Sequence, residues 1–180
     1  ELARQRKARG RPGHVTCVDK ANVFAAFAFF RKIFEERAAK FPDIGASSAY
    51  VDATALDMIR RPWTMDVLVT ENMFGDILSD LTAGLAGGMG MAPSGDIGDR
   101  HAVFQPAHGS APDIAGQGKA NPVATVLSVA MMLEWLGVEA GAEMVRSATA
   151  AVLADPANRT ADLGGSLSTE AMGSLIAEAI

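Results

Sequence analysis

Short apolar runs recur along the first half of the chain, and each is followed by a longer segment with helical features. Three runs have the length and the side chains typical of strands: 14–19 (HVTCVD), 44–51 (IGASSAYV) and 65–70 (MDVLVT). The segments that follow them predict helices over 24–41, 52–61 and 71–86. This alternation of strand and helix predicts a parallel or mixed α/β layer structure.

The segment 24–41 places Phe27, Phe30 and Phe34 at helical spacing, with charges gathered towards its end. A stripe of this kind predicts a helix face that packs into the core. We therefore interpret the phenylalanines as core residues and not as part of a cofactor site.

The second half of the chain has a different pattern. Residues 87–100 (GGMGMAPSGDIGDR) are rich in glycine and proline and indicate a boundary or crossover. A short strand is predicted at 102–107 (AVFQPA). Asn121 followed by proline is typical of a helix start, and Gly137 of a helix end. Three helices are then expected, at about 122–136, at about 139–154 and from Ser168 onward.

The chain has 180 residues, of which 49% are hydrophobic and 21% charged, enough for a sizeable core. The net charge of −5 argues against nucleic acid as the main partner. A basic cluster near the start could be a phosphate-binding arm, although a solvated helix end is the favoured interpretation. The cluster consists of Arg4, Arg6, Lys7, Arg9 and Arg11. Because residues 1–11 resemble a helix end without a beginning, we expect a part of a longer protein.

Cys17 is the only cysteine, so no intrachain disulfide can form. Its place in a predicted buried strand favours a core residue over a nucleophile. No stretch is long and apolar enough to cross a bilayer, and no signal-peptide pattern is present. We expect a cytoplasmic protein without membrane contact.

Asp76 and Asp80 lie four residues apart on a predicted helix, which puts both carboxylates on one face. A solvent-facing pair is one interpretation. The alternative is a cation that offsets their repulsion, and hard oxygen ligands favour Mg²⁺ or Mn²⁺. Asp52, at the turn from the second predicted strand into the next helix, is the best third candidate ligand, although taken alone it is favoured as a helix N-cap. Turn or surface roles are favoured for Asp43, Asp57 and Asp66.

Lys20 follows the first predicted strand directly. It is either a structural ion-pair partner or a group that accepts a proton near a metal. Asn22 follows two positions later and could point the same way.

Five fragments together resemble the metal-dependent, β-decarboxylating dehydrogenases of 2-hydroxy acids, in the family's order and spacing. They are VDKANV, YVDATALDMI, TENMFGDILSDL, GGMGMAPSGDIG and HGSAPDIAGQGKANPVA. The resemblance covers only the C-terminal half of such an enzyme. It implies an isopropylmalate dehydrogenase-like α/β/α fold. Residues 1–86 would belong to the substrate, metal and dimerisation domain, and residues 87–180 to the dinucleotide-binding domain.

The resemblance also implies roles for matching residues. Lys20 would help to deprotonate the substrate hydroxyl, and Asn22 would lie near substrate and nicotinamide. Asp52, Asp76 and Asp80 would hold Mg²⁺ or Mn²⁺. In the family, the positions of Lys20 and Asp52 come from the partner subunit, which implies a homodimer with shared active sites.

The histidine-glycine loop at 108–116 would wrap the adenosine end of the cofactor. Asp113 would accept hydrogen bonds from the ribose hydroxyls and repel a 2′-phosphate, which favours NAD over NADP. NADP-dependent relatives carry lysine and tyrosine where this chain has Asp113 and Ile114. The usual G-x-G-x-x-G fingerprint is absent, as expected for a family that binds the dinucleotide on another fold. The implied cofactor residues are His108, Gly109, Ser110, Ala111, Asp113, Ile114 and Asn121.

The resemblance favours 3-isopropylmalate as substrate, with homoisocitrate, isocitrate or tartrate as alternatives. Gln105 departs from the glutamate frequent in relatives. The tyrosine and arginines that complete the chemistry belong to the family's N-terminal half, and Tyr50 does not match that tyrosine. A non-catalytic dimerisation or assembly module is the alternative from another class, and binding of nucleic acid by the basic stretch is a third.

Overall fold

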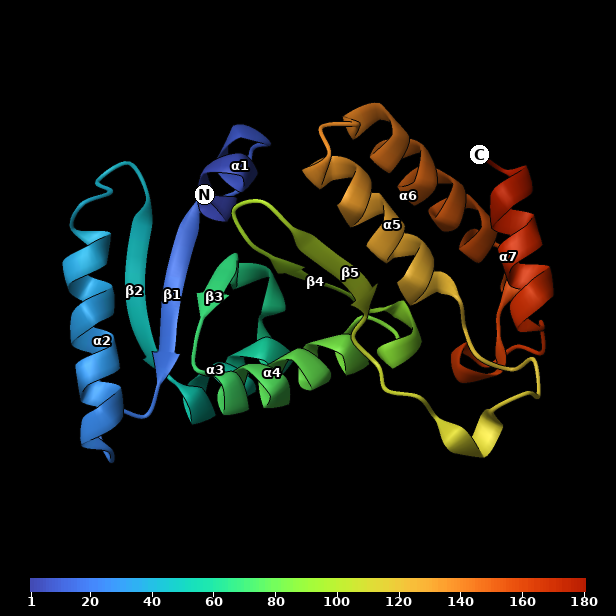
Figure 1. Ribbon diagram of the computed structural model, residues 1–180. Coiled ribbons are helices and arrows are strands. Elements are labelled where there is room, and N and C mark those ends of the chain that lie inside the picture. Colours follow the sequence, from blue (N-terminus) through green and yellow to red (C-terminus); the bar gives the residue numbers. More distant parts are fainter. The chain divides into compact units, whose positions relative to one another are not determined.

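The computed structural model describes residues 1–180 and divides into two compact units, Glu1–Thr82 and Ala83–Ile180 (Figure 1). The boundary lies within a helix that the sequence predicted as one segment. No helix in the chain is both long enough and apolar enough to cross a membrane.

The first unit is built on a parallel sheet with strand order β2-β1-β3. In the register, His14 lies opposite Gly45 and Asp19 opposite Tyr50. The predicted strands and helices are confirmed, although the third strand is shorter than expected. The elements are α1 (Leu2–Ala8), β1 (His14–Asp19), α2 (Ala25–Ala38), β2 (Gly45–Tyr50), α3 (Val51–Arg60), β3 (Val67–Val69) and α4 (Asn72–Leu85), the last of which ends in the second unit.

The core of the first unit lies between β1 and the helices α3 and α4. Val18, Met58 and Leu78, one from each of these elements, are buried together. Burial of an apolar side chain of this size contributes about 1.5–3 kcal/mol. Because α3 and α4 each direct an apolar stripe at this cluster, the helices that follow β2 and β3 are fixed against the sheet.

The phenylalanine stripe of α2 is less buried than the sequence predicted. Phe27, Phe30 and Phe34 are half-buried, and no residue of α2 is fully buried. Phe27 stacks on Phe74 with ring centroids 5.0 Å apart. The stripe therefore faces other apolar groups without being enclosed by them.

Two residues of the basic cluster at the start of the chain are held by ion pairs. Arg4 donates two hydrogen bonds to the Asp43 carboxylate, at 2.8 and 2.9 Å. Arg6 pairs with Asp66, whose carboxylate also accepts from the backbone N–H of His14 at 2.9 Å. The side chain of Asp66 is only 1% exposed, so the predicted surface role was wrong. These contacts attach α1 to the segments that precede β2 and β3, and they engage the side chains of Arg4 and Arg6 within the chain.

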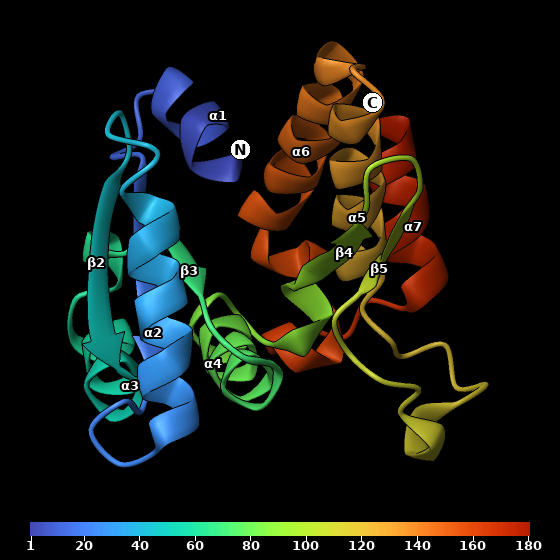
Figure 2. The same ribbon diagram turned by 60° about the vertical axis from the view of Figure 1, so that its left-hand side comes forward.

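The second unit combines an antiparallel hairpin with three helices. The hairpin consists of β4 (Pro93–Ile97) and β5 (Ala102–Pro106), and it packs on α5. The sequence predicted β5, but β4 was interpreted as part of a boundary or crossover. The helices are α5 (Val123–Trp135), α6 (Glu139–Ala154) and α7 (Thr169–Glu178). Helices α5 and α6 lie side by side in both views, and α7 packs against α6 (Figure 2).

The predicted helix ends of this unit are confirmed to within about two residues. Ser168 caps α7, because its hydroxyl accepts a hydrogen bond from the backbone N–H of Ala171 at 3.2 Å. Gly137 follows α5 with φ of 78°, a left-handed conformation that glycine adopts at little cost. The core is formed by Val123, Ala148, Val152, Met172 and Ile176.

Candidate active site and cofactor loop

The parallel sheet of the first unit brings three chain segments to one edge. Lys20 follows β1, Asp52 lies just after β2, and α4 follows β3. In open α/β sheets, ligands bind outside the carboxyl ends of the strands. The topology therefore gathers candidate catalytic groups that are far apart in the sequence.

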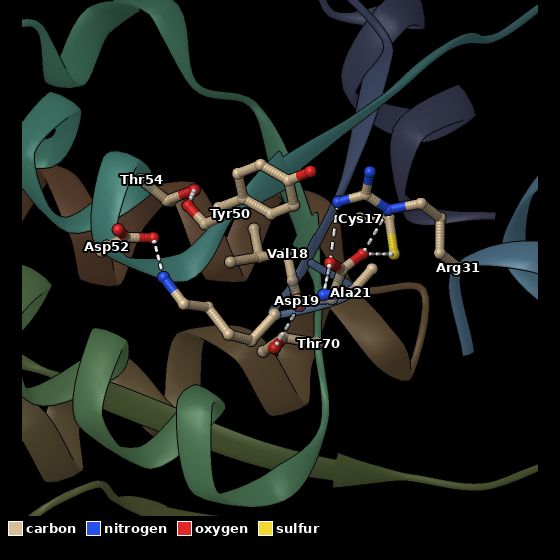
Figure 3. A network of polar contacts seen from close by, with 10 residues as sticks. Cys17, Val18, Asp19, Ala21, Arg31, Tyr50, Asp52, Thr54 and Thr70 are labelled. Carbon is tan, nitrogen blue, oxygen red and sulfur yellow. Dashed lines mark hydrogen bonds and ion pairs between the residues drawn. The ribbon is translucent and has the colours of Figure 1, made fainter. Parts of the chain in front are cut away.

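Lys20 and Asp52 form an ion pair at this edge, with 2.7 Å between Lys20 Nζ and Asp52 Oδ1 (Figure 3). The hydrogen bond from Lys20 holds the pKa of the Asp52 carboxyl below its usual value. Asp52 is the second residue of α3, and Tyr50 occupies the N-cap position, so the alternative role of Asp52 as the N-cap is wrong. Both side chains retain exposure, 23% for Lys20 and 68% for Asp52, which leaves them accessible to a ligand.

Asn22 is exposed, in the turn between β1 and α2. The backbone N–H groups of Val23 and Phe24 donate to the carbonyl oxygen of Lys20, at 3.0 and 3.1 Å. This turn holds Asn22 next to the segment that carries Lys20.

Asp76 and Asp80 lie one turn apart on α4, and both are exposed. Neither carboxylate makes a hydrogen bond or an ion pair in the chain. Two unpaired hard-oxygen groups at this spacing fit part of the coordination shell of a divalent ion. No group of three or more His, Cys, Asp or Glu residues in the chain could hold a metal ion. A single chain thus offers only Asp76 and Asp80 together as metal ligands. The third candidate, Asp52, is paired with Lys20 elsewhere in the same unit.

A buried ionic network next to Lys20 was not predicted from the sequence. Asp19, which ends β1, is completely buried, and its carboxylate accepts two hydrogen bonds from Arg31 of α2, at 2.8 and 2.7 Å (Figure 3). Burial opposes the charge of Asp19, but the hydrogen bonds from Arg31 and from the backbone N–H of Ala21, together with the charge of Arg31, outweigh it and keep the pKa of the carboxyl below its usual value. A carboxylate at the end of an apolar strand needs a cation, which is the signal in the sequence that could have revealed the pair.

Cys17 is buried, as predicted, with Sγ 3.6 Å from Asp19 Oδ2. Burial, together with the charge of Asp19, raises the pKa of the thiol to about 12. The thiol is therefore protonated and unsuited to nucleophilic chemistry.

The predicted cofactor loop lies between β5 and α5 and contains a short turn of 3₁₀ helix, η3 (Pro112–Ile114). Ala111 has φ of 42°, and no other non-glycine residue of the chain has a positive φ. Such strain in a loop is a feature of ligand-binding sites. Asp113 is exposed. The His108 ring lies 2.9 Å from the Gly109 carbonyl oxygen, so the local bond expected of an ordinary turn histidine is present.

Asn121, the last of the predicted cofactor residues, is buried and its side chain is engaged within the second unit. Its Oδ1 accepts from the backbone N–H of Val123 at 3.0 Å, and its Nδ2 donates to Asp162 at 3.0 Å. Pro122 occupies the position directly before α5. The hydrogen bond to Val123 is nevertheless the one expected of an asparagine that starts a helix.

Known proteins resemble this chain over nearly its whole length. The profile of the isocitrate/isopropylmalate dehydrogenase family matches residues 1–176. A 3-isopropylmalate/3-methylmalate dehydrogenase of Methanocaldococcus jannaschii is 49% identical over 99% of this chain and 54% of its own length. An isocitrate/homoisocitrate dehydrogenase of Thermus thermophilus is also 49% identical, over 97% of this chain and 53% of its own length.

Solved structures agree with the sequence comparison. The crystal structure of isocitrate dehydrogenase from Methylococcus capsulatus superposes with a TM-score of 0.92 at 41% identity, covering 99% of this chain and 53% of that one. The fold is thus the mixed α/β fold of this class of dehydrogenases. The chain belongs to the isocitrate/isopropylmalate dehydrogenase family. It spans about half the length of the curated relatives that it matches.

Proposed function

We propose that the complete protein that carries this chain oxidises and decarboxylates a 2-hydroxy acid with a 3-carboxylate, using NAD and Mg²⁺ or Mn²⁺. The observation that carries the proposal is the Lys20–Asp52 pair, with 2.7 Å between Nζ and Oδ1, at the carboxyl edge of the sheet. Family membership supplies the reaction class, and this pair supplies a proton-transfer group at the place where such folds bind ligands.

The side chains of the first unit have distinct proposed roles. A divalent ion, when bound, would polarise the substrate hydroxyl and stabilise negative charge on oxygen. Asp76 and Asp80 would hold this ion through carboxylates that have no partner within the chain. Asp52 would be a further ligand. Lys20 would take part in proton transfer from the hydroxyl at Nζ, and Asn22 would orient the substrate next to it.

The loop of the second unit supports the choice of NAD. Asp113 is exposed on η3, where its carboxylate is free to accept hydrogen bonds from ribose hydroxyls and to repel a 2′-phosphate. Ile114 stands where NADP-dependent relatives carry tyrosine. Because the side chain of Asn121 is already hydrogen-bonded to Val123 and Asp162, we propose that its backbone contributes to the adenine contact.

We favour 3-isopropylmalate as the substrate, because the VDKANV segment resembles that of isopropylmalate enzymes. Several relatives are also named 3-isopropylmalate dehydrogenase, including that of Chromohalobacter salexigens. Homoisocitrate and isocitrate are the second candidates, because a relative that is 49% identical to this chain is named for them. Tartrate is a further candidate from the resemblance of the motifs.

A homodimer with shared active sites accounts for the incomplete metal site of one chain. The helices α3 and α4 expose large apolar side chains, which a partner subunit would cover. These exposed residues are Leu56, Ile59, Met73 and Ile77.

The test is an assay of the complete protein with each candidate acid, with NAD or NADP and with Mn²⁺ or Mg²⁺. Reduction of NAD with release of CO₂ from at least one acid is the expected result. A folded, dimeric protein that binds neither Mn²⁺ nor NAD and turns over none of the acids would instead support the assembly-module alternative. Retention on RNA or DNA that weakens with salt would support the third alternative.

The shared site has a separate test in mixed dimers. Variants Lys20→Met and Asp80→Asn should each be inactive as homodimers. If Lys20 of one subunit serves Asp80 of its partner, a hybrid dimer retains one intact site, and a statistical mixture recovers about a quarter of the wild-type activity. Sites formed within single subunits would give no recovery.

A further inference from the structure

The turn that carries Lys20 is held by the buried carboxylate of Asp19. Asp19 Oδ1 accepts a hydrogen bond from the backbone N–H of Ala21 at 2.8 Å, which closes an Asx-type turn around Lys20. The same carboxylate accepts both hydrogen bonds of Arg31. The conformation of the backbone at Lys20 therefore depends on a side chain of α2.

Arg31 contacts the neighbouring strand end as well. Its guanidinium carbon lies 4.9 Å from the centre of the Tyr50 ring, and Tyr50 ends β2 two residues before Asp52. Lys20 Nζ, which pairs with Asp52, lies 6.0 Å from the same ring centre. A single guanidinium thus touches both segments whose side chains form the ion pair.

A buried ion pair is a poor choice where stability alone is needed. Apolar residues of similar volume are often neutral or stabilising at such positions, because they avoid the desolvation of two charges. Asp19 is completely buried, and the Arg31 side chain is 23% exposed. The rigid fork of arginine, which bonds a carboxylate at two points, does supply something that apolar packing lacks, namely a fixed orientation.

We infer that Arg31 is a positioning residue that, through Asp19 and Tyr50, sets the separation and orientation of Lys20 and Asp52. The expected effect of Arg31 on turnover rests on the proposed function. Its effect on the positions of Lys20 and Asp52 does not. Arg31 touches no reacting group. It acts by fixing the two strand ends, and a displacement of about 1 Å in such groups can cost about a hundredfold in rate.

The first experiment compares turnover of Arg31→Gln, Arg31→Lys and Arg61→Gln in the complete protein. Arg61→Gln is the matched control, because it removes a bidentate pair with Asp57 in the same unit without contacting Lys20. We expect Arg31→Gln to lower kcat about tenfold or more, with KM for NAD changed less than about twofold. Added guanidinium ion should restore part of kcat in Arg31→Gln only. Unchanged kcat, or an equal loss in the Arg61→Gln control, would overturn the inference.

The second experiment does not depend on activity. Lys20 is acetylated with trace acetic anhydride in protein without substrate, metal or cofactor, and its labelling is compared by mass spectrometry with that of Lys32. Release of Lys20 from Asp52 should raise its relative labelling severalfold in Arg31→Lys, which keeps the charge but loses the fork. Cys17 must remain unreactive to a thiol reagent in the same samples, which shows that the strand end is still folded.

The two tests separate the inference from the proposed function. If the wild-type protein oxidises none of the acids, the proposed function fails, while increased Lys20 labelling in the folded Arg31→Lys variant still supports the positioning role. If the wild-type enzyme is active and Lys20 labelling is the same in all variants, the positioning role is overturned and the function stands.

Discussion

Asn121 Nδ2 donates a hydrogen bond to Asp162 Oδ2 at 3.0 Å and thereby joins the start of α5 to the segment before α7. Thr160 donates to the other oxygen of the same carboxylate. Because Asn121 follows the predicted cofactor loop, this contact joins the end of the loop to the segment that contains Asp162.

Asp162→Ala should weaken the second unit, because the buried amide of Asn121 loses its carboxylate acceptor. We expect the free energy of unfolding to fall by about 1–3 kcal/mol, the usual cost of an unsatisfied buried polar group. Chemical denaturation measures the change. Glu143→Ala, which removes an exposed carboxylate of α6, is the control. Equal stability of the two variants would show that the contact contributes little.

Gly90→Ala should also destabilise this region. A Cβ atom at Gly90 would lie 2.6 Å from Asp162 Oδ2 and 2.8 Å from Asn121 Cβ, so these groups would have to shift. The expected loss is about 1–3 kcal/mol, as for overpacking elsewhere. Gly84→Ala in α4 is the matched control, since its Cβ would meet nothing within 4 Å. Thermal melts that rank the two variants in the opposite order would contradict the close approach.

Asp113→Lys should narrow or reverse the proposed preference for NAD over NADP in the complete protein. The substitution replaces an acceptor for ribose hydroxyls with a cation that attracts the 2′-phosphate. The ratio of kcat/KM for the two cofactors is the measurement. Asp96→Lys, at an exposed site on β4, introduces the same charge change as a control. An unaltered ratio in Asp113→Lys would remove Asp113 from the cofactor site.

Cys17 should resist alkylation in the native protein. Burial and the neighbouring Asp19 charge raise the pKa of the thiol to about 12, so almost no thiolate exists at pH 8. Iodoacetamide labelling should therefore proceed only as fast as the protein unfolds, and rapidly in denaturant. Rapid native labelling would indicate that the end of β1 is open to solvent.

The Arg4–Asp43 pair should make the attachment of α1 sensitive to acid. Hydrogen bonds from Arg4 lower the pKa of the Asp43 carboxyl from 3.8 to about 2. A carboxyl whose pKa is lower in the folded state contributes stability above its unfolded pKa and loses it as the pH falls through its folded pKa. Arg4→Gln should thus lower Tm at neutral pH, and the difference from wild type should shrink between about pH 4 and pH 2.

A control for this pH dependence is Lys32→Gln, which removes an exposed pair with a 3.9 Å separation on α2. Its Tm should stay close to that of the wild type at every pH, because loose exposed pairs contribute little. A constant difference between Arg4→Gln and wild type down to pH 2 would mean that the Asp43 carboxyl is not the titrating group.

Local patterns predicted most of the fold, because strand length, helical periodicity and caps are encoded within short segments. The run at 14–19 and the Ser168 cap are examples. β4 was missed because its proline and glycine are typical of turns, while its pairing with β5 supplies the stability that its own residues lack.

The candidate site was only partly predictable for a different reason. The motifs identified Lys20 and Asp52, but no pattern in the sequence states which distant residue a buried charge will meet. Arg31 lies 12 residues from its partner Asp19, and Asp162 lies 41 residues from Asn121. These partners are determined by how helices and strands pack against one another, and this packing is seen only in the folded structure.

The buried Asp19–Arg31 pair constrains how this protein can diverge. Loss of either member leaves an uncompensated charge in the interior, so we expect substitutions at these two positions to occur together. A homologue with aliphatic residues at both positions could keep the fold, but it would lack the hydrogen bonds that fix the turn around Lys20.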